Sequence, residues 1–341
     1  MSSPRKFAQV HAKTNPEPFV TDRPICLLLC IDAAYLRQAG ITLASILESN
    51  PGKPIDVTLV GSGLTHAQVD SVFAPLGARH PALRLHFRAM DPAALPDLPV
   101  TRQFSSSIYT RILLDRFIDR SHTRVLYLDA DTVVSADLTP LWNADLHGAV
   151  LGAVRDPFRL DLDAIGFAPD EPYFNSGVLL IDMERWRALD CEARVLDVLV
   201  REAHRLPWMD QDALNLALRG QVHFLSPRWN FQPRCADVPA GFLGLDDAEY
   251  AALRANPSIV HYTTSHKPWN AGFRVHYSRA FFSVARRAGL GMAPARPKTV
   301  ADRVLQAKTW LRWHFPGPFR TLRRIAKPES AALMYGARAG Q

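Results

Sequence analysis

RVLYLDADTVVSADLTPLW, from Arg124 to Trp142, is the stretch of sequence around which the rest of the chain is organised. The apolar run Val125 to Leu128 predicts a buried strand, and Asp129-Ala130-Asp131 follows it directly. Because side chains alternate along an extended backbone, the carboxylates of Asp129 and Asp131 project the same way and repel each other. A divalent cation such as Mg²⁺ or Mn²⁺ relieves that repulsion and keeps positions open for phosphate oxygens. The stretch therefore predicts a metal site at a strand end, although a solvated turn also explains two nearby aspartates.

The region before this stretch alternates between predicted strands and helices. The strands are expected over Pro24 to Ile31, Ile55 to Val60 and Leu83 to Arg88, and the helices between them over Gly40 to Glu48 and Thr65 to Leu76. This β-α-β-α-β order is typical of a parallel sheet with helices on its faces. Ligands of such sheets bind beyond the carboxyl ends of the strands, and Asp32 and Asp129 both lie at such ends.

Later segments add polar side chains that suit a catalytic site. A helix is expected over Ser105 to Phe117, with Arg111 two turns in, and Asn175-Ser176-Gly177 is expected just before a strand over Val178 to Ile181. Asp210-Gln211-Asp212 opens a further helix, where acidic side chains favour the helix dipole.

A histidine and a lysine near the end of the predicted α/β region extend the metal hypothesis. His261 lies near the end of the strand Ser258 to Tyr262, and Lys267 follows six residues later. A single histidine is weak evidence for a ligand, but two carboxylates with one imidazole suit Mn²⁺ better than an all-oxygen site does. Lys267 is placed to meet a phosphate as a point charge.

Composition narrows the class of protein. The chain has 341 residues, of which 48% are hydrophobic, so it can bury a sizeable core. None of its four cysteines forms a CxxC pair, so neither a zinc site nor a disulfide framework is suggested, and a reducing cytosol is expected. The polar start does not resemble a signal peptide, and the most apolar run, Ile25 to Ile31, is too short to span a bilayer.

The net charge of +7 is concentrated in the C-terminal tail. Residues 296–341 hold ten Lys and Arg residues and two acidic residues, so the body is close to neutral and a nucleic-acid partner is not expected. Trp310, Trp313, Phe315 and Phe319 lie among these basic residues, which is typical of a segment that binds an anionic membrane surface; a solvated basic extension is the alternative. We expect a disordered leader over 1–23, an α/β domain over 24–290 and a membrane-associating tail over 291–341.

Five sequence motifs, in a shared order, resemble the bacterial glycosyltransferases of family eight. They are LYLDADTVV…LTPLW, YFNSGVLLIDMERW, DQDALN, W-N-F and HYTTSHKPW. The resemblance covers roughly residues 24 to 285 and implies the GT-A fold, with a Rossmann-like, mostly parallel central sheet flanked by helices. It also implies retaining transfer of galactose or glucose from a UDP-sugar to a saccharide or glycolipid acceptor, in lipopolysaccharide or other cell-surface glycan synthesis. An enzyme of this kind is expected on the inner face of the cytoplasmic membrane.

The resemblance also implies roles for individual residues. The residues implied to bind the UDP-sugar are Asp32, Tyr35, Arg111, Asp129, Asn175 and Lys267. The implied ligands of Mn²⁺, with Mg²⁺ as the alternative ion, are Asp129, Asp131 and His261. The implied catalytic residues, beside the donor sugar, are Asp210 and Gln211. Asp32 and Tyr35 would bind the uracil, and Lys267 would neutralise the leaving diphosphate.

This sequence departs from the family pattern at three places. Thr264 stands where a glycine is usual, so the loop after His261 must bend without glycine's conformational freedom. Gln103 occupies a position where related enzymes can use a histidine on the phosphate. Ala33-Ala34 follow Asp32 where a more polar pair is usual, which affects the contacts to uracil or ribose.

Two routes would give retention, and three other readings of the sequence stay open. Double displacement needs Asp210 or Gln211 as nucleophile, whereas same-face attack assisted by the leaving phosphate needs none, and we favour the latter. A haloacid-dehalogenase-like phosphatase would use Asp129 as nucleophile and Asp131 as general acid. The other two readings are a noncatalytic sugar-nucleotide-binding protein and a self-glucosylating primer that accepts the sugar on a tyrosine.

Overall fold

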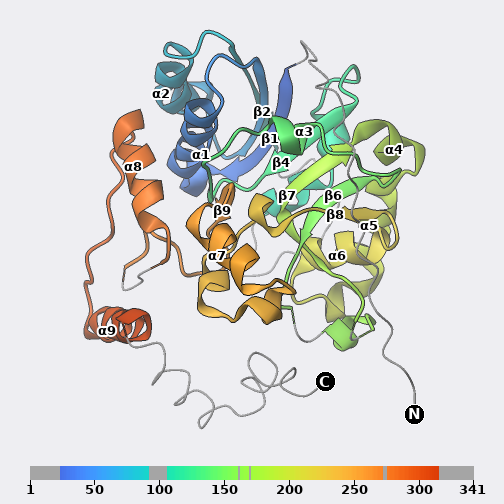
Figure 1. The fold of residues 1–341 in the computed structure, drawn as a ribbon. Helices are drawn as coiled ribbons and strands as arrows, with labels where there is room; N and C mark the ends of the chain where they lie inside the picture. Colours follow the sequence, from blue (N-terminus) through green and yellow to red (C-terminus); the bar gives the residue numbers. More distant parts are fainter. Residues whose placement is uncertain (1–23, 92–105, 160–161, 169, 272–274, 315–341) are drawn as a thin grey trace, which may run out of the picture.

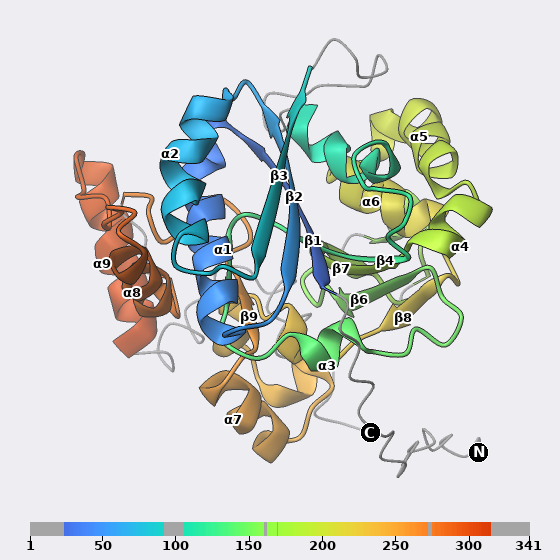
Figure 2. The ribbon, with the colours of Figure 1, turned by 90° about the horizontal axis from the view of Figure 1, so that it is seen from above.

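The computed structural model describes residues 24–91, 106–159, 162–168, 170–271 and 275–314 of the chain. These residues form three layers, a central sheet with helices on both faces (Figure 1 and Figure 2). The predicted leader over 1–23, Gln103 and the part of the tail after residue 314 lie outside the described residues.

The described residues form a central sheet of seven strands in the order β3-β2-β1-β4-β7-β6-β8. The strands are β1 (Ile25–Asp32), β2 (Ile55–Ser62), β3 (Leu83–Met90), β4 (Arg124–Leu128), β6 (Leu151–Arg155), β7 (Phe174–Asp182) and β8 (Val222–Phe224). The first four are parallel to one another, β7 is antiparallel to both β4 and β6, and β8 is parallel to β6. The predicted α/β class with a mostly parallel central sheet is confirmed.

Helices cover both faces of this sheet because its central strands are apolar on both sides. Leu27 and Leu29 of β1 belong to one buried cluster, and Leu28 belongs to a second cluster on the opposite face. The first face is covered by α1 (Leu36–Ser49) and α2 (His66–Gly77), and α8 (Ser278–Ala288) packs against the outer side of α1. The second face is covered by α4 (Met183–Ala188), α5 (Cys191–Glu202), α6 (Met209–Ala217) and the 3-10 helices η3 (Ser106–Arg111) and η4 (Leu114–Arg116).

The remaining elements lie around these layers. They are the helices α3 (Thr139–Trp142), α7 (Asp247–Ala255) and α9 (Val300–His314) and the 3-10 helices η1 (Ala33–Tyr35), η5 (Leu162–Ile165), η6 (Ala203–Arg205), η7 (Pro227–Trp229), η8 (Pro233–Asp237) and η9 (Ala240–Leu243). Helix α2 begins as predicted, because Thr65 and Gln68 form a capping box at its start.

A second, two-stranded sheet carries part of the functional region. It pairs β5 (Thr132–Val134) with β9 (Ile259–His261) in antiparallel register, with Thr132 opposite His261. Helix α1 supports this region, because the buried hydroxyl of Thr42 lies 2.9 Å from the carbonyl oxygen of Ala130 and 2.8 Å from that of Thr132. The small sheet and α1 together place His261 beside the loop that holds Asp131.

Two local predictions were wrong. The expected helix over Ser105 to Phe117 is broken into η3 and η4, where the backbone amide of Ile112 bonds to the carbonyl of Tyr109 three residues back. Tyr109 and the residues that follow it are buried on several sides, so this segment has no polar face to favour a regular surface helix. Asn175-Ser176-Gly177 lies inside β7 instead of before it, because the strand pairing continues to Phe174.

The C-terminal region continues away from the sheet. Helix α8 ends at Ala288 with Gly289 in the left-handed conformation, and α9 follows after an irregular segment (Figure 1). Among the described residues, every helix is too short or too polar to cross a membrane. The four cysteines, all within the described part of the chain, are free thiols. The predicted boundary at residue 290 stays a prediction.

Candidate active site

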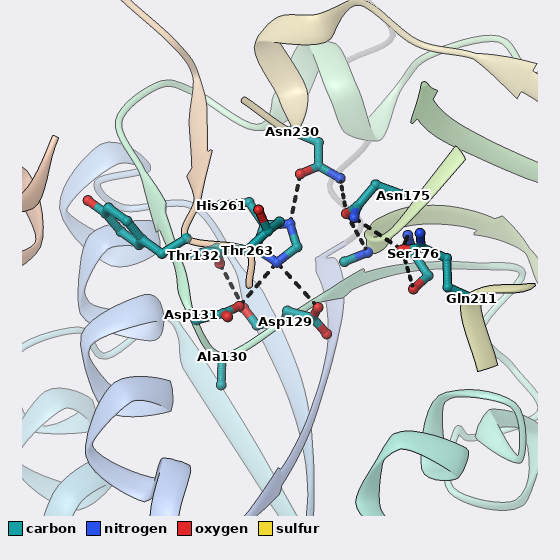
Figure 3. Close-up of polar contacts among 12 residues, drawn as sticks. Asp129, Ala130, Asp131, Thr132, Asn175, Ser176, Gln211, Asn230, His261 and Thr263 are labelled. Atoms are coloured by element: carbon teal, nitrogen blue, oxygen red, sulfur yellow. Dashed lines mark hydrogen bonds and ion pairs between the residues drawn. The ribbon is translucent and has the colours of Figure 1, made fainter. Parts of the chain in front are cut away.

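Two carboxylates and one imidazole converge at the carboxyl end of the central sheet. Asp129 follows β4, Asp131 precedes β5, and His261 is the last residue of β9. The Nε2 atom of His261 lies 3.4 Å from Oδ2 of Asp129 and 3.2 Å from Oδ1 of Asp131 (Figure 3). One ligand atom from each residue lies within 4.8 Å of the other two, a spacing that a single metal ion can bridge. The structure therefore brings the three predicted metal ligands together.

The charges within this cluster fit a bound cation. Burial favours the neutral carboxyl forms, but Arg111 holds the pKa of Asp129, and Lys267 that of Asp131, below the usual range. Burial by itself would lower the pKa of His261, but the carboxylates of Asp131 and Asp129 raise it to about 9. Oδ1 of Asp131 is buried and makes no hydrogen bond. A divalent cation satisfies this oxygen and replaces the imidazole proton, and two carboxylates with one imidazole suit Mn²⁺.

Gly177 allows the three ligands to approach β7. A Cβ atom at this position would lie 2.7 Å from both Oδ2 of Asp129 and Nδ1 of His261, closer than real Cβ contacts. The backbone carbonyl of Gly177 also accepts a hydrogen bond from the amide of Asp129 at 2.8 Å. Glycine is required here because the imidazole occupies the space of a side chain.

Lys267 lies against the Asp129–Asp131–His261 cluster, which we call the metal cluster because its side chains are the predicted metal ligands. Its ammonium group contacts Oδ2 of Asp131 and donates to the carbonyl oxygen of Tyr262 at 2.6 Å. Only 9% of Lys267 is exposed, so its charge is directed into the site. This position fits the predicted role beside a diphosphate, because a phosphate bound to the cation at Asp131 would lie within the field of the same ammonium.

Arg111 joins the metal cluster to the predicted catalytic residues. The Nη2 atom of Arg111 lies 3.0 Å from Oδ1 of Asp129. Its Nη1 atom donates to the carbonyl oxygen and the hydroxyl oxygen of Ser176, both at 3.1 Å. The Nε atom of Arg111 lies 3.1 Å from Oδ2 of Asp210, but both atoms are buried and no hydrogen bond joins them. Burial raises the pKa of Asp210 to about 6, with Asp129 adding to the effect and Arg111 opposing it. This ion pair holds the carboxylate of Asp210 beside Arg111.

A carboxamide network continues from Arg111 across the site. Oε1 of Gln211 accepts hydrogen bonds from the backbone amide of Ser176 and from Nδ2 of Asn175, both at 3.1 Å, and from the Ser176 hydroxyl at 3.3 Å. The amide groups of Asn175 and Gln211 both approach Asp156, at 3.4 Å. The predicted donor-sugar residues Asn175, Asp210 and Gln211 therefore share one buried region.

The predicted uracil residues lie at the end of β1. Oδ1 of Asp32 accepts the backbone amides of Ala34 at 3.0 Å and Tyr35 at 3.2 Å, so it caps η1. The ring of Tyr35 meets Trp269 edge to face, with centroids 6.1 Å apart. Thr264, which replaces the usual glycine, has a φ of 68°, so the loop does bend through the left-handed region, at a conformational cost.

Several residues of the site had no assigned role in the sequence analysis. Asn230 bonds to both His261 and Asn175, Tyr127 donates to Asp129 at 2.6 Å, and Asp156 receives the carboxamides described above. Asn230 belongs to the W-N-F motif, which was the available signal for it. Asp156 directly follows β6, so its place at a strand end was a comparable signal.

Asp212 lies in the first turn of α6, as expected of an acidic residue that favours the helix dipole, and it also makes specific buried contacts. It is completely buried, accepts the hydroxyl of Tyr173 at 2.6 Å and the backbone amide of Trp208 at 2.8 Å, and pairs with Arg159 at 3.1 Å. It therefore anchors α6 to its neighbours and holds Asp210 and Gln211 in place.

A cavity of about 500 Å³ opens beside the carboxamide network. Asp156 and Asn230, which touch that network, also line the cavity. Its walls include the aromatic rings of Tyr173, Phe231 and Phe242. Polar groups next to aromatic rings are typical of sites that bind small polar ligands such as sugars.

Comparison with known proteins agrees with this geometry. The model of a family described as glycosyl transferase family 8 matches residues 26–272. General stress protein A of Bacillus subtilis is 27% identical over 272 residues, covering 76% of this chain and 93% of that protein. A lipopolysaccharide 1,2-glucosyltransferase of Escherichia coli K12 is 26% identical over 262 residues, covering 75% of each chain.

A solved structure has the same fold. It is the galactosyltransferase LgtC in complex with donor and acceptor sugar analogues, with a TM-score of 0.67 and 28% identity. The match covers 79% of this chain and 98% of that one. This likeness confirms the GT-A fold that the sequence resemblance implied.

The contact between Gly177 and the metal cluster gives a testable prediction. We expect Gly177→Ala to weaken Mn²⁺ binding about 10–100-fold, because the new methyl group displaces His261 or Asp129. The free energy of unfolding should also fall by about 1–3 kcal/mol, since the site is already fully packed. Titration followed by electron paramagnetic resonance measures the first quantity, and urea denaturation measures the second.

Gly77→Ala is the matched control, because a Cβ atom at Gly77 meets no other atom within 4 Å and its φ is not positive. This variant should bind Mn²⁺ as the unaltered protein does. Unchanged Mn²⁺ affinity in Gly177→Ala would contradict the role given to this glycine.

Proposed function

The chain belongs to glycosyl transferase family 8, and on that basis we propose that it transfers a hexose from a UDP-sugar to a hydroxyl group of a saccharide acceptor, with retention of configuration. The observation that carries the proposal is the Asp129–Asp131–His261 cluster, with Arg111 and Lys267 beside it and a cavity next to it. The names of the relatives, a lipopolysaccharide glucosyltransferase and a galactosyltransferase with sugar ligands, support galactose or glucose and a cell-surface glycan acceptor.

We propose Mn²⁺, with Mg²⁺ as the alternative, as the ion held by Asp129, Asp131 and His261. When bound, the ion would supply Lewis-acid stabilisation to the charge that develops on the leaving diphosphate. Lys267 would add a second positive charge there, in an environment that excludes water and strengthens electrostatic interactions. Asp32 and Tyr35, at the end of β1, would hold the uracil.

The cavity beside Asp156 and Asn230 is proposed to receive the acceptor. An acceptor hydroxyl in this cavity would lie next to Asn175 and Gln211, the residues proposed to surround the donor sugar. The aromatic walls suit the apolar faces of sugar rings, and Asp156 suits their hydroxyl groups. The acceptor hydroxyl would form the new glycosidic bond and lose its proton to the leaving UDP as the bond to UDP breaks.

Same-face attack is the proposed route to retention. Oε1 of Gln211 already accepts three hydrogen bonds, so it would have to lose them to act as a nucleophile. Oδ2 of Asp210 is held by the charge of Arg111 at 3.1 Å, which lowers its nucleophilicity. Both residues are better placed to bind the donor sugar and stabilise its positive charge in the transition state.

The phosphatase alternative is less consistent with this geometry. Asp129 would have to attack a phosphate, but its Oδ1 is engaged by both Tyr127 and Arg111. A nucleophile of that class is also expected after the first strand of its sheet, whereas Asp129 follows β4.

The first prediction of this proposed function concerns the donor. Purified protein with Mn²⁺ should slowly release UDP from one member of a panel of UDP-sugars. Asp131→Asn should reduce the rate on the order of 100-fold or more, because loss of the metal removes several kcal/mol of stabilisation. Asp145→Asn, at an exposed aspartate outside the site, is the matched control and should retain the rate. Release of phosphate from sugar phosphates, without UDP release, would instead indicate the phosphatase.

The second prediction concerns the mechanism. After incubation with the reactive UDP-sugar, intact-mass spectrometry should find no hexose on Asp210 or Gln211, because same-face attack forms no covalent intermediate. A hexose bound to either residue would refute that route. A stable hexose on a tyrosine would support self-glucosylation over transfer to an external acceptor.

We further propose that the C-terminal tail attaches the enzyme to the cytoplasmic face of the membrane, next to a lipid-linked acceptor. In α9, Val300, Val304 and Leu311 share one face and are 75%, 46% and 45% exposed. Arg303 and Lys308 flank this face and are exposed too. Exposed apolar residues between basic ones suit an anionic bilayer surface.

The third prediction tests this attachment. The protein should sediment with vesicles that contain phosphatidylglycerol and much less with neutral vesicles. Val304→Asp combined with Leu311→Asp should reduce the bound fraction about tenfold or more, since each buried aliphatic side chain contributes about 1.5–3 kcal/mol. Val200→Asp, at a 65% exposed valine on α5, is the control and should bind as before. Full binding by the double variant would argue against attachment through α9.

A further inference from the structure

A chain of hydrogen bonds behind His261 begins at a backbone amide. The amide of Gly177 donates to Oδ1 of Asn175 at 3.1 Å. Nδ2 of Asn230 donates to the same oxygen at 2.9 Å, and Oδ1 of Asn230 lies 2.9 Å from Nδ1 of His261. Figure 3 shows Asn230 between the imidazole and Asn175. All three side chains are buried, so water does not compete for these bonds.

The direction of every bond in this chain follows from its first member. A backbone N–H can only donate, so the group of Asn175 that faces Gly177 must be the carboxamide oxygen. That oxygen can only accept, so Asn230 must present its NH₂ group to it. The oxygen of Asn230 is then left facing His261, and Nδ1 of the imidazole must carry a proton to bond with it.

We propose that Asn230 is a positioning residue that fixes His261 in the Nδ1–H tautomer and so directs the lone pair of Nε2 toward the metal site. The inference rests on the proposed function, because the metal is part of it. Nε2 is the ring nitrogen that faces Asp129 and Asp131. A metal-binding histidine commonly donates its other N–H to a fixed acceptor, which sets both the tautomer and the ring orientation.

The same hydrogen bonds connect His261 to the residues proposed to bind the donor sugar. Nδ2 of Asn175 donates to Oε1 of Gln211, so Asn175 bonds on one side toward the metal cluster and on the other toward a predicted catalytic residue. Asn230 is the link to His261. Its loss would release the imidazole while leaving the bond between Asn175 and Gln211 in place.

Mn²⁺ titration of the full chain, without sugar nucleotide, tests the proposal. Asn230→Leu removes the acceptor and should weaken Mn²⁺ binding about 10–100-fold. Asn230→Asp loses the hydrogen bond to Oδ1 of Asn175 but keeps an acceptor oxygen for Nδ1, so it should bind Mn²⁺ more tightly than Asn230→Leu does. A role in packing alone would not distinguish the two variants in this way.

Asn50→Leu is the matched control for removal of a buried carboxamide. Asn50 is 2% exposed and makes two hydrogen bonds, to Ile46 and Leu138, away from the site. It should lower the free energy of unfolding without changing Mn²⁺ affinity.

Nitrogen-15 NMR of the histidines reports which ring nitrogen is protonated. It is done on the unaltered protein, so it does not depend on whether a variant folds. In the unaltered protein loaded with Cd²⁺, His261 should show a protonated Nδ1 and a metal-bound Nε2. Metal bound to Nδ1, or equal Mn²⁺ affinity in Asn230→Leu and the unaltered protein, would overturn this inference alone. An unaltered protein that binds neither ion would overturn the metal site of the proposed function as well.

Discussion

The repulsion between the half-buried carboxylate of Asp129 and the buried carboxylate of Asp131 is the constraint on which the rest of the site depends. Three cationic neighbours reduce this repulsion. Arg111 pairs with Asp129, Lys267 pairs with Asp131, and His261 faces both. Even so, Oδ1 of Asp131 makes no hydrogen bond. The site has the electrostatic character of one that a cation completes.

Meeting that constraint requires a precise backbone around the carboxylates. Helix α1 fixes the loop between β4 and β5 through Thr42, and the pairing of β5 with β9 brings His261 to the same place. Gly177 then lets β7 pass directly behind the imidazole. The fold thus uses buried, hydrogen-bonded elements to hold charges that would otherwise move apart or become neutral.

Hydrogen bonds connect the metal cluster to the polar residues beside the cavity. Backbone amides of Gly177 and Ser176 set the orientation of Asn175 and Gln211, whose side chains reach toward Asp156 and the cavity. Because backbone groups cannot rotate to a different bonding role, they transmit a fixed orientation to the side chains. Gln211 is therefore held in one orientation by the groups that bond to its carboxamide oxygen.

The sequence by itself determined the α/β class, the first parallel strands and the three candidate metal ligands, since these follow from apolar runs, strand ends and family motifs. The break in the expected helix before Arg111 and the extension of β7 through Asn175 depended on tertiary structure, because packing and strand pairing override local preference there. Only the tertiary structure assigned roles to Asn230 and Gly177. Asn230 does belong to a family motif, but its role, like that of Gly177, comes from its place beside His261, and a motif by itself does not show such contacts between residues far apart in the chain.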